Sequence, residues 1–159
     1  MTTFDRLPVL ERRRIQAEVI KPIYEAMVSR IGEDTAREIL GGAIKNAAIA
    51  EGRRFAERDG EEGGLQGFVD MQHLWEADGA LETEVVEHTD TTYAYKVNRC
   101  RYAEMYRDMG MADIGFLLSC NRDGTFCEGY DPNLKLTRKQ TLMQGDDHCD
   151  FHYRLHEER

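Results

Sequence analysis

The hydrophobic period of the sequence changes once, and that change restricts the chain to a mixed fold. From residue 15 to about residue 50, apolar residues recur every three or four positions, the period of an amphipathic helix. Residues 81–86 and 92–98 are instead rich in β-forming residues, and they flank His88-Thr89-Asp90, which is a hairpin signal. Helices followed by antiparallel hairpins are typical of the α+β class.

A second hairpin is predicted near the C-terminus. Residues 134–143 follow Pro132 and read as a strand, Gly145-Asp146-Asp147 reads as a turn, and residues 148–155 alternate between polar and apolar side chains. We therefore predict an α+β fold in which an antiparallel sheet of about four strands, in two hairpins, packs against N-terminal and central helices. Because no long linker divides the 159 residues, residues 1–159 are predicted to form a single domain.

Two N-terminal helices separated by Gly32 are predicted to pair antiparallel, each with an apolar stripe toward the core. The stripe of the first is Ile15, Val19, Ile23, Met27 and Ile31, widened by Ile20 and Tyr24. That of the second is Ala36, Ile39, Leu40, Ile44 and Ala47. The Arg12-Arg13-Arg14 run is predicted to lie on the solvated face of the first helix. Trp75 is predicted to be a core residue, with the wall of a flat ligand's pocket as the alternative.

Composition argues against several partners. The net charge of −9 opposes a nucleic-acid backbone. The N-terminus lacks the apolar segment of a signal peptide, and no apolar stretch is long enough to span a membrane. We therefore expect a cytoplasmic protein that binds neither nucleic acid nor membrane. Its four cysteines are then expected to be reduced, as buried residues, ligands or nucleophiles.

Alternation assigns the faces of the last strand. Cys149, Phe151 and Tyr153 share one side, which we expect to face the core, and His148, Asp150 and His152 share the other. The second set has the spacing of a metal site on one strand face. A polar stripe facing solvent or another subunit is the preferred interpretation, because strand faces opposite the core are ordinarily polar.

Cys120 and Asp123 are the first candidates for chemistry. They are three residues apart, so a helix would place them on one face, with Cys127 two turns beyond Cys120. A cysteine beside a carboxylate serves as a ligand pair or as a nucleophile with a base. The alternative is that Cys120 is a small buried hydrophobe and Asp123 caps a turn. Cys100 and Cys149 also lie at core elements, so the three cysteines are predicted to share a pocket.

Three segments resemble the L-2-amino-thiazoline-4-carboxylic acid hydrolase family. They are Arg99-Cys100-Arg101-Tyr102-Ala103-Glu104, Cys120-x-x-Asp123, and Thr141-Leu142-x-x-Gly145-Asp146-x-x-Cys149-Asp150-Phe151. Ile20-Lys21-Pro22-Ile23-Tyr24 and Gly79-Ala80-Leu81 extend the similarity to the first half. The resemblance implies hydrolytic opening of a small heterocycle at a C–N bond. The Gly145-x-x-x-Cys149 hairpin also resembles 4-vinyl-reductase-like ligand-binding domains, some of which hold zinc through cysteines, although Leu142 and Met143 stand where such sites place a further cysteine.

The first functional hypothesis is therefore a hydrolase acting on a cyclic amide or amidine. Cys120 would be nucleophile or metal ligand, and Asp123 base or ligand. Cys100 and Cys149 would support the pocket or complete a site for zinc or another divalent metal. A substrate carboxylate could pair with Arg99, Arg101 or Arg122.

Two other classes of function remain open. The chain could be a non-enzymatic small-molecule-binding domain with structural cysteines. It could also be an assembly protein, including a homo-oligomer, if Val86, Tyr93 and the outer strand face formed an interface.

Overall fold

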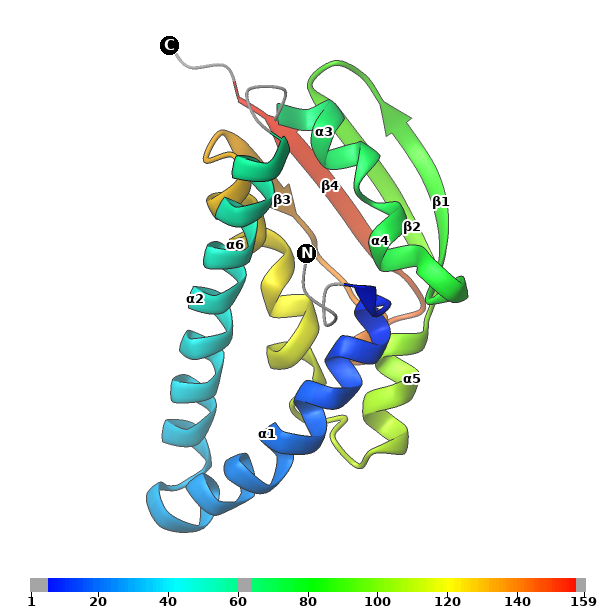
Figure 1. Ribbon diagram of the computed structural model, residues 1–159. Coiled ribbons are helices and arrows are strands. Elements are labelled where there is room, and N and C mark those ends of the chain that lie inside the picture. Colours follow the sequence, from blue (N-terminus) through cyan, green and yellow to red (C-terminus); the bar gives the residue numbers. More distant parts are fainter. Residues whose placement is uncertain (1–5, 60–63, 157–159) are drawn as a thin grey trace.

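A four-stranded antiparallel sheet forms one layer of the molecule, and helices pack on one of its faces (Figure 1). The computed structural model describes residues 6–59 and 64–156. The strands are β1 (Leu81–His88), β2 (Thr92–Cys100), β3 (Leu134–Thr137) and β4 (Cys149–Leu155), in the order β1-β2-β4-β3. The predicted α+β fold with two hairpins is thus confirmed. Within the described residues, no helix is both long and apolar enough to cross a membrane.

The two hairpins meet at the centre of the sheet, where β2 pairs with β4. Tyr95 lies opposite Phe151 and Val97 lies opposite Cys149. The inner side chains form an aromatic cluster in which the rings of Tyr95 and Phe151 stack with their centroids 4.8 Å apart. Tyr93 also belongs to this buried cluster and Val86 is exposed, so the two residues do not form one outer interface.

The third strand is shorter than predicted, because side chains take over the hydrogen bonds of its second half. Asp150 Oδ1 accepts the backbone N–H groups of Lys139 (2.9 Å) and Gln140 (2.8 Å). Asp146 Oδ2 accepts that of Thr141 (2.8 Å), and Cys149 Sγ accepts that of Leu142 (3.2 Å). Residues 138–142, which we call the clamped loop, therefore leave the sheet and lead into the 3-10 turn η5 (Leu142–Gln144).

The helical layer contains two long helices, α1 (Val9–Ile31) and α2 (Glu33–Asp59), which diverge from a turn at Gly32 (Figure 1). Short helical segments follow: α3 (Gly64–Asp70), α4 (His73–Glu76), η3 (Ala77–Gly79) and α5 (Arg101–Asp108). A π-helical turn, η4 (Phe116–Cys120), runs directly into α6 (Asn121–Tyr130). Such π-helical turns are rare and occur frequently at functional sites.

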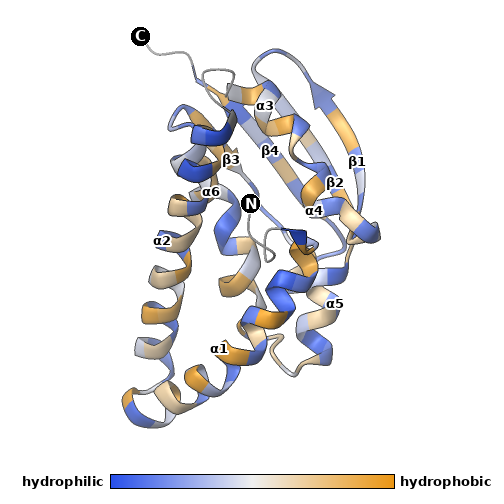
Figure 2. Ribbon diagram, in the orientation of Figure 1, coloured by the Kyte–Doolittle hydropathy of each residue, from blue (hydrophilic) through white to orange (hydrophobic). Residues whose placement is uncertain are grey.

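The predicted inner stripe of α1 is wrong for four of its residues and confirmed for Tyr24, Ile20 and Met27, which lie in the core or pack against it. Ile15, Val19, Ile23 and Ile31 are 41–60% exposed, and Figure 2 shows hydrophobic residues along both long helices. The buried side of α1 consists of Val9, Leu10, Arg12, Arg13, Ala17 and Tyr24. The prediction selected the more hydrophobic of two stripes, whereas the true core face includes two arginines. In α2, Ala36 and Ile44 are buried as predicted, but Ile39 is exposed.

The predicted α1–α2 pair is likewise not the main helix contact, because α2 packs along α6 at backbone distance. A Cβ atom on Gly52 would collide with the Phe126 carbonyl oxygen, and one on Gly129 would collide with the Ile49 carbonyl oxygen. Only glycine permits such an approach. This contact fixes α6 between α2 and the sheet.

We expect Gly52→Ala to destabilise the protein by about 3 kcal/mol or more, because the methyl group meets backbone that cannot rotate away. Gly42→Ala is the matched control on the same helix. Nothing lies within 4 Å of its Cβ position, so this change should stabilise the protein by about 0.5–1 kcal/mol. Denaturant unfolding measures both; equal effects would contradict the proposed contact.

Candidate functional site

The structure brings Cys100, Cys120, Cys149 and Asp123 together around one internal cavity. The lobe that they line, the thiol lobe, has a volume of about 70 Å³. The convergence arises because β2 ends at Cys100, β4 begins at Cys149, and η4 and α6 carry the other two residues. Cys127 lies on α6 in the aromatic core and does not line this lobe.

A second lobe of about 60 Å³ adjoins the first and shares six lining residues with it. The shared residues are Arg13, Trp75, Leu81, Arg122, Asp123 and Phe151. Trp75 is thus both a core residue and a cavity wall. The second lobe also includes Glu51, and we call it the arginine lobe.

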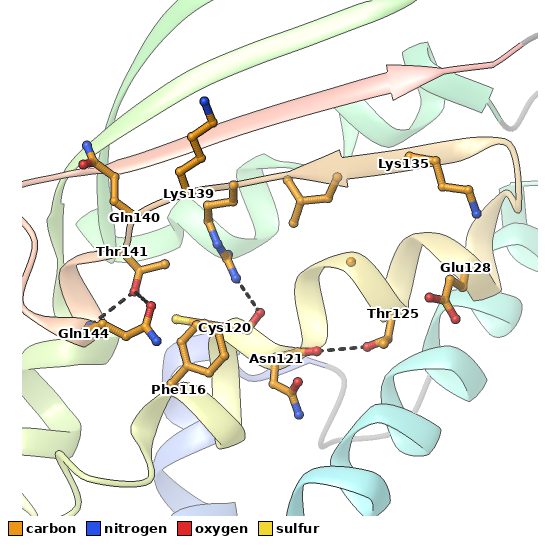
Figure 3. Close-up of a pocket in the computed structure, with 13 residues that line it drawn as sticks. Phe116, Cys120, Asn121, Thr125, Glu128, Lys135, Lys139, Gln140, Thr141 and Gln144 are labelled. Atoms are coloured by element: carbon orange, nitrogen blue, oxygen red, sulfur yellow. Dashed lines mark hydrogen bonds between the residues drawn. The ribbon is translucent and has the colours of Figure 1, made fainter.

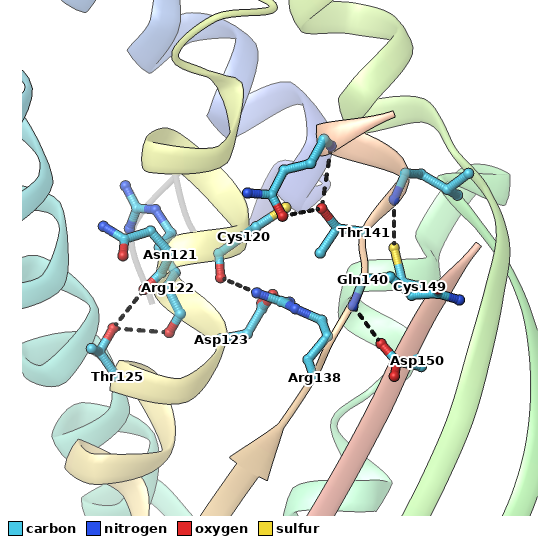
Figure 4. Close-up of polar contacts among 12 residues, drawn as sticks. Cys120, Asn121, Arg122, Asp123, Thr125, Arg138, Gln140, Thr141, Cys149 and Asp150 are labelled. Carbon is cyan, nitrogen blue, oxygen red and sulfur yellow. Dashed lines mark hydrogen bonds and ion pairs between the residues drawn. The ribbon is translucent and has the colours of Figure 1, made fainter. Parts of the chain in front are cut away.

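Asp123 is held by a buried ion pair with Arg138, the first residue of the clamped loop. Arg138 Nη1 lies 2.5 Å from Asp123 Oδ2, and Nη2 donates to the Cys120 carbonyl oxygen at 3.0 Å (Figure 4). The guanidinium also lies over the Phe151 ring at 4.8 Å. Burial raises the pKa of Asp123, and Arg138 opposes that rise. The carboxyl group is therefore a stronger base than an exposed one.

Sequence reasoning missed Arg138 because it lay inside a predicted strand. The signal that could have found it is the expected position of Asp123 beside Cys120, since a carboxylate buried in a pocket needs a positively charged partner. Asp150 was expected on an outer polar face, yet its carboxylate holds the clamped loop. Because Arg138 is the first residue of that loop, Asp150 also helps to position Arg138. His148 contacts Asp147 and Gln140, and His152 lines neither lobe.

All three cavity thiols are held in their protonated form. Burial raises the pKa of Cys100 to about 11. Burial, and then the charge of Asp123, raise the pKa of Cys120 well above its usual value. Burial also raises the pKa of Cys149. Cys100 Sγ accepts the Ala103 N–H and caps α5, and Cys149 Sγ accepts the Leu142 N–H. Cys100 and Cys149 thus have structural roles.

The same protonation bears on a metal site, because thiols bind zinc as thiolates. In the part of the chain that the structure describes, no three His, Cys, Asp or Glu side chains are grouped so as to hold a metal ion. That Cys100, Cys120 and Cys149 share zinc or another divalent metal stays a prediction.

Of the three predicted carboxylate partners, only Arg122 lines the cavity. Arg99 is exposed and pairs with Glu82 and Glu104, and Arg101 donates to the Asp78 carbonyl oxygen. Arg122 is buried and lies 3.7 Å from Glu51.

Arg12 and Arg13, expected on a solvated face, are also buried, so that prediction is wrong. They converge on Glu51 at 3.8 and 3.6 Å. Arg14 alone behaves as expected, half-exposed and paired with Glu11.

A larger outer cleft of about 330 Å³ opens between α6 and the clamped loop (Figure 3). Cys120 borders both this cleft and the thiol lobe. Arg138 borders the cleft, whereas its partner Asp123 borders the internal cavity. The Arg138–Asp123 ion pair therefore stands between the two spaces.

Comparison with known proteins gives a family match and likenesses to distant solved structures. A family model described as L-2-amino-thiazoline-4-carboxylic acid hydrolase matches residues 12–153, whereas no curated protein matches. The phenol-responsive sensory domain of the transcription activator PoxR, solved with phenol, gives a TM-score of 0.54 at 9% identity and covers 86% of this chain and 73% of that one.

The second structure is trafficking protein particle complex subunit 3 from Naegleria fowleri, covalently bound to palmitic acid. It gives a TM-score of 0.51 at 12% identity, over 91% of this chain and 97% of that one. At these identities, the two structures show a shared fold alone.

The hydrogen bonds that Asp150 accepts from the clamped loop predict that two substitutions on the same face of β4 differ in their effect on stability. Asp150→Ala leaves two backbone N–H groups without their acceptor and should cost roughly 1–3 kcal/mol. His152→Ala, the neighbouring residue on that face, should stay within about 0.5 kcal/mol. Urea unfolding of both variants measures the change in unfolding free energy. A larger loss in His152→Ala than in Asp150→Ala would contradict the role given to Asp150.

Raised thiol pKa values predict a loss of stability in alkali. Unfolded thiols ionise near pH 8.5, whereas folded Cys100 ionises near 11, so the folded state holds more protons between these values. Stability therefore falls as pH rises through this window. Between pH 8 and pH 11, the unfolding free energy of Cys100→Ala should therefore fall by roughly 2–3 kcal/mol less than that of the wild type. Unfolding free energies at pH 8, 9.5 and 11 test it; parallel curves for the two proteins would refute it.

Proposed function

The chain belongs to the L-2-amino-thiazoline-4-carboxylic acid hydrolase family, and from this premise we propose that it is a hydrolase that opens a small heterocycle at a cyclic C–N bond. The observation that carries the proposal is the thiol lobe, which both Cys120 and Asp123 line. Opening such a ring needs an attacking group, a base, and a proton for the leaving nitrogen. Cys120 and Asp123 are of the right types to supply all three.

In the proposed first step, Asp123 takes the proton of Cys120 Sγ. The sulfur bonds to the amidine carbon of the ring, in the tautomer whose ring nitrogen carries a hydrogen, and the π electrons of the carbon–nitrogen double bond move onto the exocyclic nitrogen. When the adduct collapses, that double bond re-forms, the bond from the carbon to the ring nitrogen breaks, and the ring nitrogen becomes an amine by taking the proton from Asp123. The raised pKa values of Cys120 and Asp123 suit this order, because the thiol stays protonated until a base acts on it.

In the second step, water attacks the same carbon. Asp123 takes a proton from the water, the carbon–Sγ bond breaks, and the proton returns to the thiol. The balance is one water consumed, one ring C–N bond broken and one amine released. Arg138 acts as a positioning residue, because its ion pair fixes one oxygen of Asp123.

A sharper form of the proposal names the substrate as a 2-amino-thiazoline, whose ring carbon between nitrogen and sulfur is an amidine-type carbon. The family description supports this class. The cavity is also small, which favours a single five-membered ring over a larger substrate.

Cys120→Ser and Asp123→Asn should each lower the rate of ring opening per folded molecule at least ~100-fold, because removal of a nucleophile or general base has effects of this size. The unfolding midpoint should stay near wild type in Cys120→Ser and fall in Asp123→Asn, which leaves Arg138 buried without its carboxylate. Disappearance of 2-amino-thiazoline-4-carboxylate, followed by chromatography, measures the rate. The control is Cys127→Ala, on the same helix but outside the cavity, which should keep its activity per folded molecule. Full activity in both site variants would contradict the assignment.

The alternative is a small-molecule-binding domain without catalysis. The capping roles of Cys100 and Cys149 favour it, because they explain two of the three thiols without chemistry. The two functions separate in one assay: a binding domain would retain the intact heterocycle through a long incubation, whereas the hydrolase would release the opened product.

A further inference from the structure

Buried positive charge exceeds buried negative charge where α1 meets α6. Arg12, Arg13 and Arg122 are only 7, 5 and 8% exposed, and all three converge on one carboxylate, Glu51. The other acidic residue of the cavity, Asp123, has its own cation in Arg138. Arg13 and Arg122 alone thus share a single carboxylate and together carry one positive charge beyond it. A charge excess in a water-poor site is unfavourable unless an anion joins it.

The contacts to Glu51 leave donor capacity facing the arginine lobe. They span 3.6–3.8 Å, whereas charge-assisted hydrogen bonds are usually about 2.7–2.9 Å. Arg13 Nη1 donates to Gln16 at 3.1 Å, but its Nη2 has only the long contact to Glu51 among the printed distances of the described residues. Arg122 uses Nε on the Leu118 carbonyl oxygen at 2.8 Å, and its two terminal nitrogens have contacts of 3.5 and 3.7 Å.

We infer that Arg13 and Arg122 form an anion subsite that binds the carboxylate of a small flat ring. A guanidinium matches a carboxylate with two parallel N–H donors, and here two guanidinium groups come from different helices. The subsite belongs to the cavity itself, since both arginines line both lobes. This inference concerns binding and does not rest on hydrolysis.

The rest of the cavity indicates what the carboxylate is attached to. Trp75 and Phe151 line both lobes, so a flat ring has aromatic walls on its path from the arginine lobe to the thiol lobe. The two lobes together approach the roughly 150 Å³ at which an apolar protein cavity accepts benzene. This size favours a single five- or six-membered ring over a larger ligand. A ligand anchored at Arg13 and Arg122 would extend its ring toward Cys120 and Asp123.

The test uses two probes that differ only in charge, thiazole-4-carboxylate and thiazole-4-carboxamide, neither of which has a bond that the proposed reaction would open. Isothermal titration calorimetry on the whole protein at pH 7.5 should show the carboxylate binding at least ~10-fold more tightly than the carboxamide, because hydrogen bonds to charged groups are the stronger ones. Arg13→Gln and Arg122→Gln should each lower affinity for the carboxylate roughly 10- to 100-fold and leave carboxamide binding nearly unchanged.

Arg14→Gln is the matched control, because Arg14 is next to Arg13 on the same helix but half-exposed and outside the cavity. It should bind both probes like the wild type. The comparison of the two probes uses only the wild-type protein, so it tests the inference even if Arg13→Gln fails to fold. Equal affinity for the two probes, no carboxylate binding at millimolar concentration, or unchanged binding in folded Arg13→Gln and Arg122→Gln would each overturn the inference.

Discussion

The contact between the backbones of α2 and α6 sets the geometry on which the rest of the molecule depends. Gly52 and Gly129 let the two helices touch without intervening side chains, so α6 has one orientation relative to α2. This orientation directs Arg122 toward Glu51 of α2 and Gln16 of α1, and it directs Asp123 toward Arg138 beside the sheet. The positions of both charged groups in the cavity follow from a contact that contains no charge at all.

The two charged groups differ in how well they are balanced. Asp123 and Arg138 form a short one-to-one pair, which holds the clamped loop to the start of α6. Arg13 and Arg122 share one carboxylate, Glu51, and keep longer distances from it. A balanced buried pair has a structural explanation of its own, whereas an unbalanced group is explained most simply by a ligand of opposite charge. The cavity therefore has one end suited to anchoring and another suited to proton transfer.

Much of the sheet could be predicted from the sequence, because strand alternation depends on local pattern and the last strand obeys it. Alternation also placed Cys149 and Phe151 on the inner face, where they line the cavity. Three features could not be found in this way. The inner face of α1 contains Arg12 and Arg13, and a hydrophobicity pattern assigns arginines to solvent. Residues 138–142 were included in a predicted strand, but side-chain oxygens and a sulfur accept the N–H groups of residues 139–142. The contact between Gly52 and Gly129 joins residues far apart in sequence.

The hydrogen bonds of the clamped loop also explain the C-terminal motif structurally, and this affects how the motif can be used to compare relatives. Gly145, Asp146, Cys149 and Asp150 shape a turn and hold a loop, so a related chain that retains them is expected to retain the frame. The residues proposed as reagents stand elsewhere, at positions 120 and 123, and those proposed as the anchor stand at positions 13 and 122. Relatives could therefore keep the motif intact while exchanging one substrate for another or losing catalysis altogether. Assigning an activity to a member of this family calls for reading those four positions rather than the motif.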